Sequence, residues 1–305
     1  MNKANAPVLS VIVPTAGKRE RLVLALHALI AQSLPADRFE TIVVLDAAED
    51  DGSLEAIAAA EAAGLRVSTL LAGGLGQAAA QNRGAAAARG DVLLFMDDDV
   101  LLSPTYLATC NARVAQAPDT VCRAPVYLLR YLAAFRDPER GLRYDGRPDG
   151  GSLLAGRTIS RAMVLSDWPA IARQCRHRNR FERLVSDCLG AAPQRHPWLG
   201  YSGSGVALQR SLFEAAGGYD EAFGRRWGCE AIELGYRLWR RGARFRELPG
   251  ILSAHMDHPR GASLTSFADS FDYFAAKHGD LAIREVQALI AGPSLLPPVM
   301  AAPSA

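Results

Sequence analysis

The stretch DVLLFMDDDVLLSP, residues 91–104, decides the fold. Five hydrophobic residues, 92–96, run directly into Asp97, Asp98 and Asp99. Three consecutive carboxylates would repel one another strongly if they were buried with nothing to neutralise them. A strand that is apolar throughout is typical of a parallel sheet covered on both faces, and open α/β sheets bind their ligands at the carboxyl ends of such strands. The stretch therefore predicts a central strand that leads into a binding site.

Short apolar runs alternate with helix-like segments on the amino-terminal side of this stretch. We expect strands at 8–15, 39–46 and 65–72, and helices at 20–33, 53–64 and 76–90. On the carboxyl-terminal side we expect a loop at 136–152, helices around 167–190, a short strand and a helix within 201–223, a helix at 229–242 and a strand at 243–249. The order predicts an α/β fold with a mostly parallel sheet flanked by helices.

Composition limits the class of protein. The 305 residues are 49% hydrophobic and 22% charged, which suits a globular chain with a full core. The formal net charge of +2 favours neither a nucleic-acid partner nor a polyanionic tail. The five cysteines have no CxxC spacing, so a reducing compartment fits best. The start, MNKANAPVLS, has no apolar signal core, and we expect a cytoplasmic protein, with peripheral membrane contact left open.

Carboxylates that converge at a strand end are stable when a cation or hydrogen-bond donors neutralise them. Hard divalent cations such as Mg2+ or Mn2+ accept oxygen ligands and take further ligands from substrate phosphates. The triplet therefore favours a metal that holds a nucleotide diphosphate or a sugar-nucleotide diphosphate. The alternative is a solvated acidic turn in which Asp98 or Asp99 caps the next segment.

A second alternative comes from GLGQAA. Gly74, Gly76 and Ala79 fit the G-x-G-x-x-A pattern of a dinucleotide-binding turn, and Asp97 lies at the spacing of a ribose-binding acid. A complete strand-helix-strand-helix pattern precedes the motif, however, and three acids exceed what a ribose hydroxyl needs. A nicotinamide-dependent oxidoreductase thus remains the weaker reading.

Four segments together carry a resemblance to a known family. They are LSVIVPTAGKRERLVLALHALIAQ (9–32), FETIVVLDAAEDDG (39–52), AAAQNRGAAAARGDVLLFMDDDVLLSP (78–104) and YSGSGVALQRSLFEAAGGYDEAFGRRWGCEAIELGYRLWRRG (201–242). In order and spacing they resemble family 2 glycosyltransferases of the GT-A fold. The resemblance implies a nucleotide-sugar donor, with a UDP-sugar favoured, a bound Mn2+ or Mg2+, and transfer with inversion at the anomeric carbon.

The resemblance also implies roles for individual residues on the donor side. Pro14 and Thr15 would line the nucleotide pocket, Asp46 would face the base, and Asp97 and Asp99 would form the metal-binding Asp-x-Asp. Asp98 and Asn82 complete the implied donor site, with Gln81 standing where the family often has arginine. In SAHMDHPRG, His255 would be the third metal ligand and His258 its substitute; without the family, two such histidines are more often a surface turn.

On the acceptor side an inverting transfer needs a carboxylate that takes the hydroxyl proton. Glu230 occupies the family's Glu-Asp position, while Ala231 stands where many members have the Asp proposed as the base. The alternative for Glu230 is a carboxylate that complements a helix dipole. Glu233 and Arg237, four residues apart, are expected to form a structural ion pair.

Further acceptor contacts are expected from Trp198, Gly203 and Trp227, because aromatic faces beside exposed backbone suit a stacked sugar. The two tryptophans are equally plausible as core residues. The segment 157–195 carries eight arginines and could contact an anionic acceptor or a lipid headgroup, or form a solvated helix face.

The expected organisation is a single GT-A domain with a nucleotide-sugar-binding half at 1–104 and an acceptor-binding, catalytic half at 105–260. Helices and a flexible Pro-rich tail are expected at 261–305. Because the Asp is missing at Ala231, a degenerate nucleotide-sugar-binding protein is the alternative to an active metal-dependent, inverting glycosyltransferase.

Overall fold

The computed structural model describes residues 7–47, 49–145, 158–226, 228–259 and 264–292. Within these ranges the main sheet has seven strands in the order β11-β6-β10-β4-β1-β2-β3. The strands are β1 Leu9–Thr15, β2 Phe39–Leu45, β3 Val67–Leu71, β4 Val92–Phe95, β6 Thr120–Arg123, β10 Val206–Gln209 and β11 Arg244–Glu247. The predicted α/β class is confirmed, and the Asp triplet follows a strand in the middle of the sheet.

The sheet is mixed and mostly parallel. Strand β1 pairs in parallel with both β2 and β4, and β2 pairs in parallel with β3. Strand β10 runs antiparallel to β4, so a strand from the carboxyl-terminal half lies directly beside the strand that carries the triplet. All residues of β1, β2 and β4 are buried, as expected for apolar strands covered on both faces.

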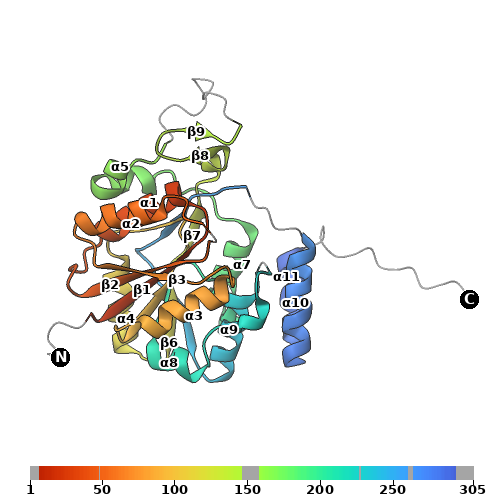
Figure 1. Cartoon of the computed structure of the whole chain (residues 1–305). Helices are drawn as coiled ribbons and strands as arrows, with labels where there is room; N and C mark the ends of the chain where they lie inside the picture. Colours follow the sequence, from red (N-terminus) through yellow and green to blue (C-terminus); the bar gives the residue numbers. More distant parts are fainter. Residues whose placement is uncertain (1–6, 48, 146–157, 227, 260–263, 293–305) are drawn as a thin grey trace, which may run out of the picture.

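Helices cover both faces of this sheet (Figure 1). Side chains of α1, α2 and α4 share one buried cluster with β1, and side chains of α3, α8 and α9 share another. Gly84 lets α3 approach β1 closely, because a Cβ there would lie 2.5 Å from Cγ2 of Ile12. These helices are α1 Arg19–Ile30, α2 Ser53–Ala62, α3 Gln77–Ala87, α4 Tyr106–Gln116, α8 Arg210–Ala215 and α9 Glu230–Arg240.

A small second sheet begins immediately after the triplet. Its strand order is β5-β12-β7, with β5 Val100–Leu102, β7 Val126–Leu128 and β12 Ser253–His255. Strand β12 pairs antiparallel with β5, which sets His255 opposite Val100. This pairing joins two segments that are far apart in the sequence and brings a histidine to the residue that follows Asp99.

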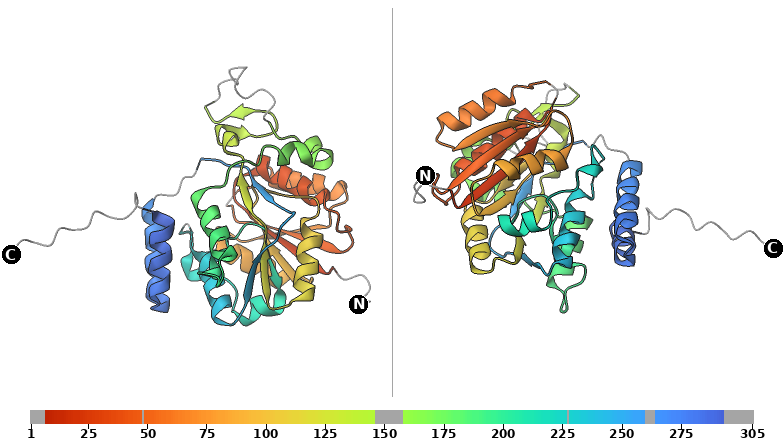
Figure 2. Two further views of the ribbon diagram at one scale, coloured as in Figure 1. Left: turned by 180° about the vertical axis from the view of Figure 1, so that it is seen from behind. Right: turned by 60° about the horizontal axis from the view of Figure 1, so that its bottom comes forward.

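Most predicted elements are found with shorter bounds, and the remainder differ in detail. The expected loop at 136–152 contains the hairpin β8 Phe135–Asp137 and β9 Leu142–Arg143, while 146–152 lies outside the described residues. The region from 130 to 200 adds η2 Arg130–Ala134, α5 Arg161–Ser166, α6 Trp168–Ala172, α7 Arg180–Gly190 and η3 Pro197–Gly200. The turn η4 Glu221–Phe223 precedes α9, and α10 Leu264–His278 and α11 Leu281–Ala291 lie beside α7 and α9 (Figure 2). The expected tail at 293–305 is outside the described residues.

Candidate active site

The three aspartates at the end of β4 point to three different sets of partners. Asp97 accepts hydrogen bonds from Gln77 Nε2 at 2.9 Å and from Ser204 Oγ at 2.5 Å. Burial, together with repulsion from Asp99, raises the pKa of Asp97 to about 6. Asp97 thus faces α3 and the loop before β10, on the side where the two halves of the chain meet.

Asp98 is held beneath the loop that follows β1. Thr15 Oγ1 donates to Asp98 Oδ2 at 2.7 Å, and Lys18 Nζ lies 3.3 Å from Asp98 Oδ1. The residue is only 3% exposed, and this burial raises the pKa of its carboxyl group although Lys18 opposes the shift. Thr15 therefore contacts the triplet directly.

Asp99 meets both predicted histidines. His255 Nε2 lies 3.4 Å from Asp99 Oδ1, and His258 Nε2 lies 3.0 Å from Asp99 Oδ2. The carboxylate is buried, which alone would raise its pKa, but His255 and Lys18 outweigh burial and hold the pKa of Asp99 well below its usual range. One ligand atom from each of Asp99, His255 and His258 lies within 4.8 Å of the others.

The donor set of this cluster fits a divalent cation. Asp99 Oδ1 is buried and receives no hydrogen bond from a described residue. His258 Nδ1 lies 2.9 Å from the carbonyl oxygen of Pro259, which can only accept, so a proton on Nδ1 would leave the lone pair of Nε2 available to a cation. One carboxylate and two imidazoles form a two-histidine, one-carboxylate set. This cluster differs from the metal set expected from the sequence because it includes His258, and the metal contact expected of Asp97 stays a prediction.

A buried arginine positions the segment that carries the histidines. Arg21 is 3% exposed, and its guanidinium donates to the carbonyl oxygens of Met256 and Asp257 at 3.2 and 3.1 Å. It also donates to the carbonyl oxygens of Leu132 and Phe135. Sequence reasoning missed Arg21; the available signal was an arginine on the otherwise apolar face of the first helix.

A pocket of about 420 Å³ lies at the carboxyl ends of β1, β2 and β3. Its described lining residues include Thr15, Gly17, Leu45 and Leu71, and do not include Pro14, Asp46 or Asn82. The pocket opens on the same strand ends as the triplet, with Thr15 common to both. The nucleotide contact of Pro14, which lies in β1, stays a prediction.

Asp46 fixes the loop beside this pocket. Its two carboxylate oxygens accept hydrogen bonds from the backbone N–H groups of Leu75 and Gly76, both at 2.9 Å. Gly76 packs closely against the segment before α9, because a Cβ on Gly76 would lie 2.1 Å from the carbonyl oxygen of Gly224. The contact of Asp46 with a base stays a prediction, and its observed bonds give it a role in shaping the loop.

The same loop bears on the dinucleotide alternative. The GLGQAA motif follows β3, the edge strand of the sheet, and its second glycine is closed off by Gly224. A dinucleotide-binding turn needs open backbone at that glycine for the pyrophosphate. The arrangement therefore does not support a nicotinamide site.

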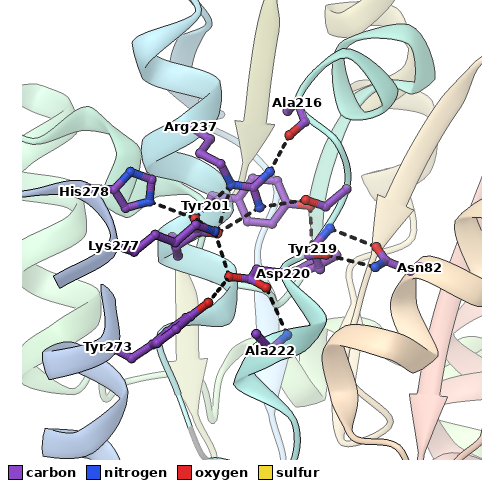
Figure 3. Close-up of polar contacts among 12 residues, drawn as sticks. Asn82, Tyr201, Ala216, Tyr219, Asp220, Ala222, Arg237, Tyr273, Lys277 and His278 are labelled. Atoms are coloured by element: carbon purple, nitrogen blue, oxygen red, sulfur yellow. Dashed lines mark hydrogen bonds and ion pairs between the residues drawn. The ribbon is translucent and has the colours of Figure 1, made fainter. Parts of the chain in front are cut away.

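Asn82 is engaged in holding a turn. Its amide nitrogen donates to the carbonyl oxygen of Tyr219, and its oxygen accepts from the N–H of Tyr219 (Figure 3). The amide nitrogen also donates to Glu221 Oε1. These bonds fix the turn before α9. The donor contact expected of Asn82 stays a prediction, and its observed bonds give it a role in holding this turn.

Glu230 is the first residue of α9 and lies on the Asp97 side of the site. It follows Cys229, whose φ of +75° allows the sharp entry into the helix. Glu230 Oε2 is buried and has no hydrogen-bond partner among the described residues. Burial, with a further contribution from the charge of Asp97, raises the pKa of Glu230 to about 7. A carboxyl group with this pKa can accept a proton near neutral pH.

Glu233 anchors α9 rather than entering the site. It is fully buried and forms ion pairs with Arg237, Lys277 and His278, all at 2.8 to 2.9 Å (Figure 3). Burial alone would raise the pKa of Glu233, but Arg237 and Lys277 lower it, so the carboxylate stays charged. Lys277 also pairs with Asp220 at 2.7 Å. The predicted ion pair with Arg237 is confirmed and extends to α10.

The acceptor contacts expected of Trp198, Trp227 and Gly203 have different outcomes, and that of Trp198 needs correction. Trp198 is fully buried, and its ring packs edge-to-face on Tyr236 and Phe274, so it is a core residue. Trp227 lies outside the described residues. Gly203 has φ of +89° and a Cβ there would lie 3.4 Å from Ala231 Cβ, which places this glycine between Ser204 and the start of α9. Its contact with an acceptor stays a prediction.

Several described arginines of the arginine-rich segment have acidic partners. Arg161 pairs with Glu139, Arg195 with Glu285, and Arg178 with Glu247. The contact with an anionic acceptor or a lipid stays a prediction. Across the part of the chain that the structure describes, no helix is long and apolar enough to span a membrane.

Comparisons with known proteins place this site in a family context. Residues 10–133 match the model of glycosyl transferase family 2. The validoxylamine A glucosyltransferase of Streptomyces hygroscopicus subsp. jinggangensis (strain 5008) is 28% identical over 287 residues, which cover 91% of this chain and 63% of that protein. A second validoxylamine A glucosyltransferase is matched over 58% of its length, so the chain spans about three fifths of these relatives.

Two solved structures are similar in fold. S. aureus TarS 1–349 in complex with UDP-GlcNAc has a TM-score of 0.59 at 15% identity, covering 93% of this chain and 72% of that one. The mannosyltransferase PcManGT from Pyrobaculum calidifontis in complex with GDP-Man and Mn2+ has a TM-score of 0.56 at 16% identity, covering 94% and 80%. These structures confirm the GT-A fold, and the resemblance to family 2 glycosyltransferases is supported by the family match at residues 10–133.

Proposed function

We propose that this chain, whose residues 10–133 belong to glycosyl transferase family 2, is a divalent-metal-dependent, inverting glycosyltransferase. It would move a sugar from a nucleoside diphosphate to an acceptor hydroxyl. The observation that carries the proposal is that a candidate cation cluster and a candidate base are both found around the aspartates at the end of β4. The cluster of Asp99, His255 and His258 suits a cation, and Glu230 offers a buried carboxylate oxygen without a partner. The solved structures of TarS with UDP-GlcNAc and of PcManGT with GDP-Man and Mn2+ support the proposal because they have a similar fold.

Each group has a role in a single displacement. The nucleoside would occupy the pocket lined by Thr15 and Gly17, with the diphosphate directed toward Asp99. A cation at the cluster would supply positive charge to the departing diphosphate. The acceptor oxygen bonds to the anomeric carbon as the bond from that carbon to the phosphate oxygen breaks. The acceptor proton passes to Glu230 Oε2. Asp97, fixed by Gln77 and Ser204, would orient the sugar.

The test is a donor-hydrolysis screen across UDP-, GDP- and dTDP-sugars with Mn2+, with EDTA as control. We expect slow release of nucleoside diphosphate from one donor class, UDP-sugars first, and none in EDTA. Sustained release in EDTA would remove the metal from the mechanism. Binding of NADH with no response to any sugar nucleotide would instead restore the nicotinamide alternative.

The ligand set predicts which ion works best. Imidazole nitrogens suit Mn2+ better than Mg2+, which prefers oxygen ligands in a near-ideal octahedron. We expect Mn2+ to support nucleoside diphosphate binding at concentrations about tenfold or more below those of Mg2+. Calorimetric titration of UDP and GDP in each ion, over a matched concentration series, measures this difference. Equal potency of the two ions would mean that the histidines are not ligands.

The raised pKa of Glu230 predicts a pH dependence. Because the base acts only when deprotonated, and burial raises its pKa to about 7, kcat/KM should rise as the pH passes through about 7. A cation near Asp97 offsets the repulsion that contributes to this shift, so the rise should move to lower pH at saturating Mn2+. The measurement is the pH profile of kcat/KM at two Mn2+ concentrations. A profile that is flat between about pH 6 and pH 8 at both concentrations would contradict the assignment.

A further inference from the structure

We infer that Lys18 is a built-in counter-ion of the site, which holds Asp98 and Asp99 in the metal-free chain and turns to the donor diphosphate once a cation takes Asp99. This inference rests on the proposed function and assigns a specific residue to diphosphate binding. It predicts that removing the lysine strengthens the binding of a divalent cation and weakens the binding of a nucleoside diphosphate.

The ammonium group bridges two of the three carboxylates. Lys18 Nζ lies 2.8 Å from Asp99 Oδ2 and 3.3 Å from Asp98 Oδ1. The two aspartate side chains are 3% and 5% exposed, whereas that of Lys18 is 32% exposed. Within the described residues, the ion pairs of the triplet with lysine or arginine are both made by Lys18. Two buried carboxylates thus share one lysine ammonium group that reaches them from solvent.

The charge of Lys18 is secured by these partners. A lysine ammonium group is charged at neutral pH, and the contacts of Lys18 with the carboxylates of Asp98 and Asp99 favour the charged form. The side chain is therefore a fixed positive charge at neutral pH. A divalent ion that binds Asp99 must compete with it for the same carboxylate.

Lys18 also stands between the nucleotide pocket and the metal cluster. Its neighbour Gly17, with φ of +74°, lines the pocket. The carbonyl oxygen of Lys18 accepts hydrogen bonds from the N–H groups of Arg21 and Leu22 at 3.0 and 2.9 Å, which fixes its backbone at the start of α1. A nucleoside diphosphate with its nucleoside beside Gly17 and its phosphates at Asp99 passes the Lys18 ammonium.

The same ammonium thus opposes one ligand and favours the other. Toward a metal ion, it is a competitor for Asp99 and a like charge. Toward a diphosphate, it is an attractive charge that remains after Asp99 has been taken by the ion. A residue that only supports the local structure would not change the two affinities in opposite directions.

The test compares Lys18→Met with Lys18→Arg, and uses Arg113→Met as the matched control for loss of one positive charge. Arg113 is exposed on α4, and no part of the site described above involves it. Mn2+ binding without nucleotide is measured by calorimetry, and UDP and GDP binding is then measured at saturating Mn2+. We expect Lys18→Met to bind Mn2+ about threefold or more tightly and the bound nucleotide about tenfold or more weakly. Lys18→Arg should keep the nucleotide affinity, and Arg113→Met should change neither affinity.

The other outcomes have distinct meanings. Weaker Mn2+ binding by Lys18→Met, or unchanged nucleotide affinity, overturns the inference. If Lys18→Met does not fold, Lys18→Gln, which keeps a polar end, is measured instead with the same expected signs. If the wild-type chain binds neither UDP nor GDP with Mn2+, the proposed function itself fails. If the wild type binds and the Lys18 variants match it, only the role of Lys18 fails.

Discussion

Glu230→Gln should lower kcat about 100- to 10,000-fold while donor binding barely changes. The amide keeps the size of the side chain and much of its hydrogen bonding but cannot accept the acceptor's proton. The wild-type carboxylate suits this step because its Oε2 is buried without a partner and its pKa is raised to about 7. Steady-state kinetics with the donor found in the screen, together with calorimetric donor binding, measure the two effects separately.

A matched control is Glu214→Gln, which makes the same chemical change on the exposed surface of α8 and should leave kcat unaltered. Full turnover in Glu230→Gln would move the base to another carboxylate, or to an acceptor such as a thiol or phenol that ionises by itself. A further outcome concerns Ala231. If the wild type turns over no acceptor and Ala231→Asp gains activity, the natural chain is a degenerate binder.

Asp99→Asn should weaken Mn2+-dependent nucleoside diphosphate binding about 100-fold, and His255→Ala and His258→Ala about tenfold each. Asp99 lies between the two histidines at 3.4 and 3.0 Å and carries the negative charge of the cluster, so its loss removes both a ligand and the charge. Sequence reasoning gave His255 the larger role, whereas the distances give the two histidines equal weight. Calorimetric titration of UDP and GDP at fixed Mn2+ measures all three variants.

The control for the histidine variants is His177→Ala, because His177 is exposed in the loop before α7 and is not part of the cluster. This variant should bind as the wild type does. The metal assignment is wrong if the wild-type chain binds nucleoside diphosphate equally well in EDTA. If only His255→Ala weakens nucleoside diphosphate binding, His258 is not a regular ligand of the cation and can at most substitute for His255.

Sequence patterns predicted those features of the fold that follow from burial and local order. The apolar run at 92–96 and the acids behind it were sufficient to place a site at the end of a central strand, because burial on both faces leaves little choice of structure. The pairing of Glu233 with Arg237 was also accessible, since residues four apart lie on one helix face. In both cases the information was contained in adjacent or nearly adjacent residues.

Features that depend on long-range pairing were predicted less well. Trp198 suited a binding surface and a core equally, and its burial depends on Tyr236 and Phe274, which lie on two later helices. The inward position of His258 depends on β12 pairing with β5 and on the bonds of Arg21 to the segment after β12. The spacing of apolar residues predicts which face of a helix or strand is buried, and it does not predict which distant residues cover that face.

Because Glu233 anchors α9, two separate parts of the chain position the nucleotide and the base of the proposed reaction. The pocket lies at strand ends of the main sheet, and the cation cluster combines Asp99, after β4, with His255 and His258, at and after the end of β12. Glu230 instead sits on a helix whose next turn is bound to Lys277 and His278 of α10. The position of Glu230, the proposed base, therefore depends on α10, which contributes no residue to the candidate cation cluster. Substitutions in α10 can therefore change acceptor binding without changing nucleotide binding. The two specificities are thus free to evolve separately.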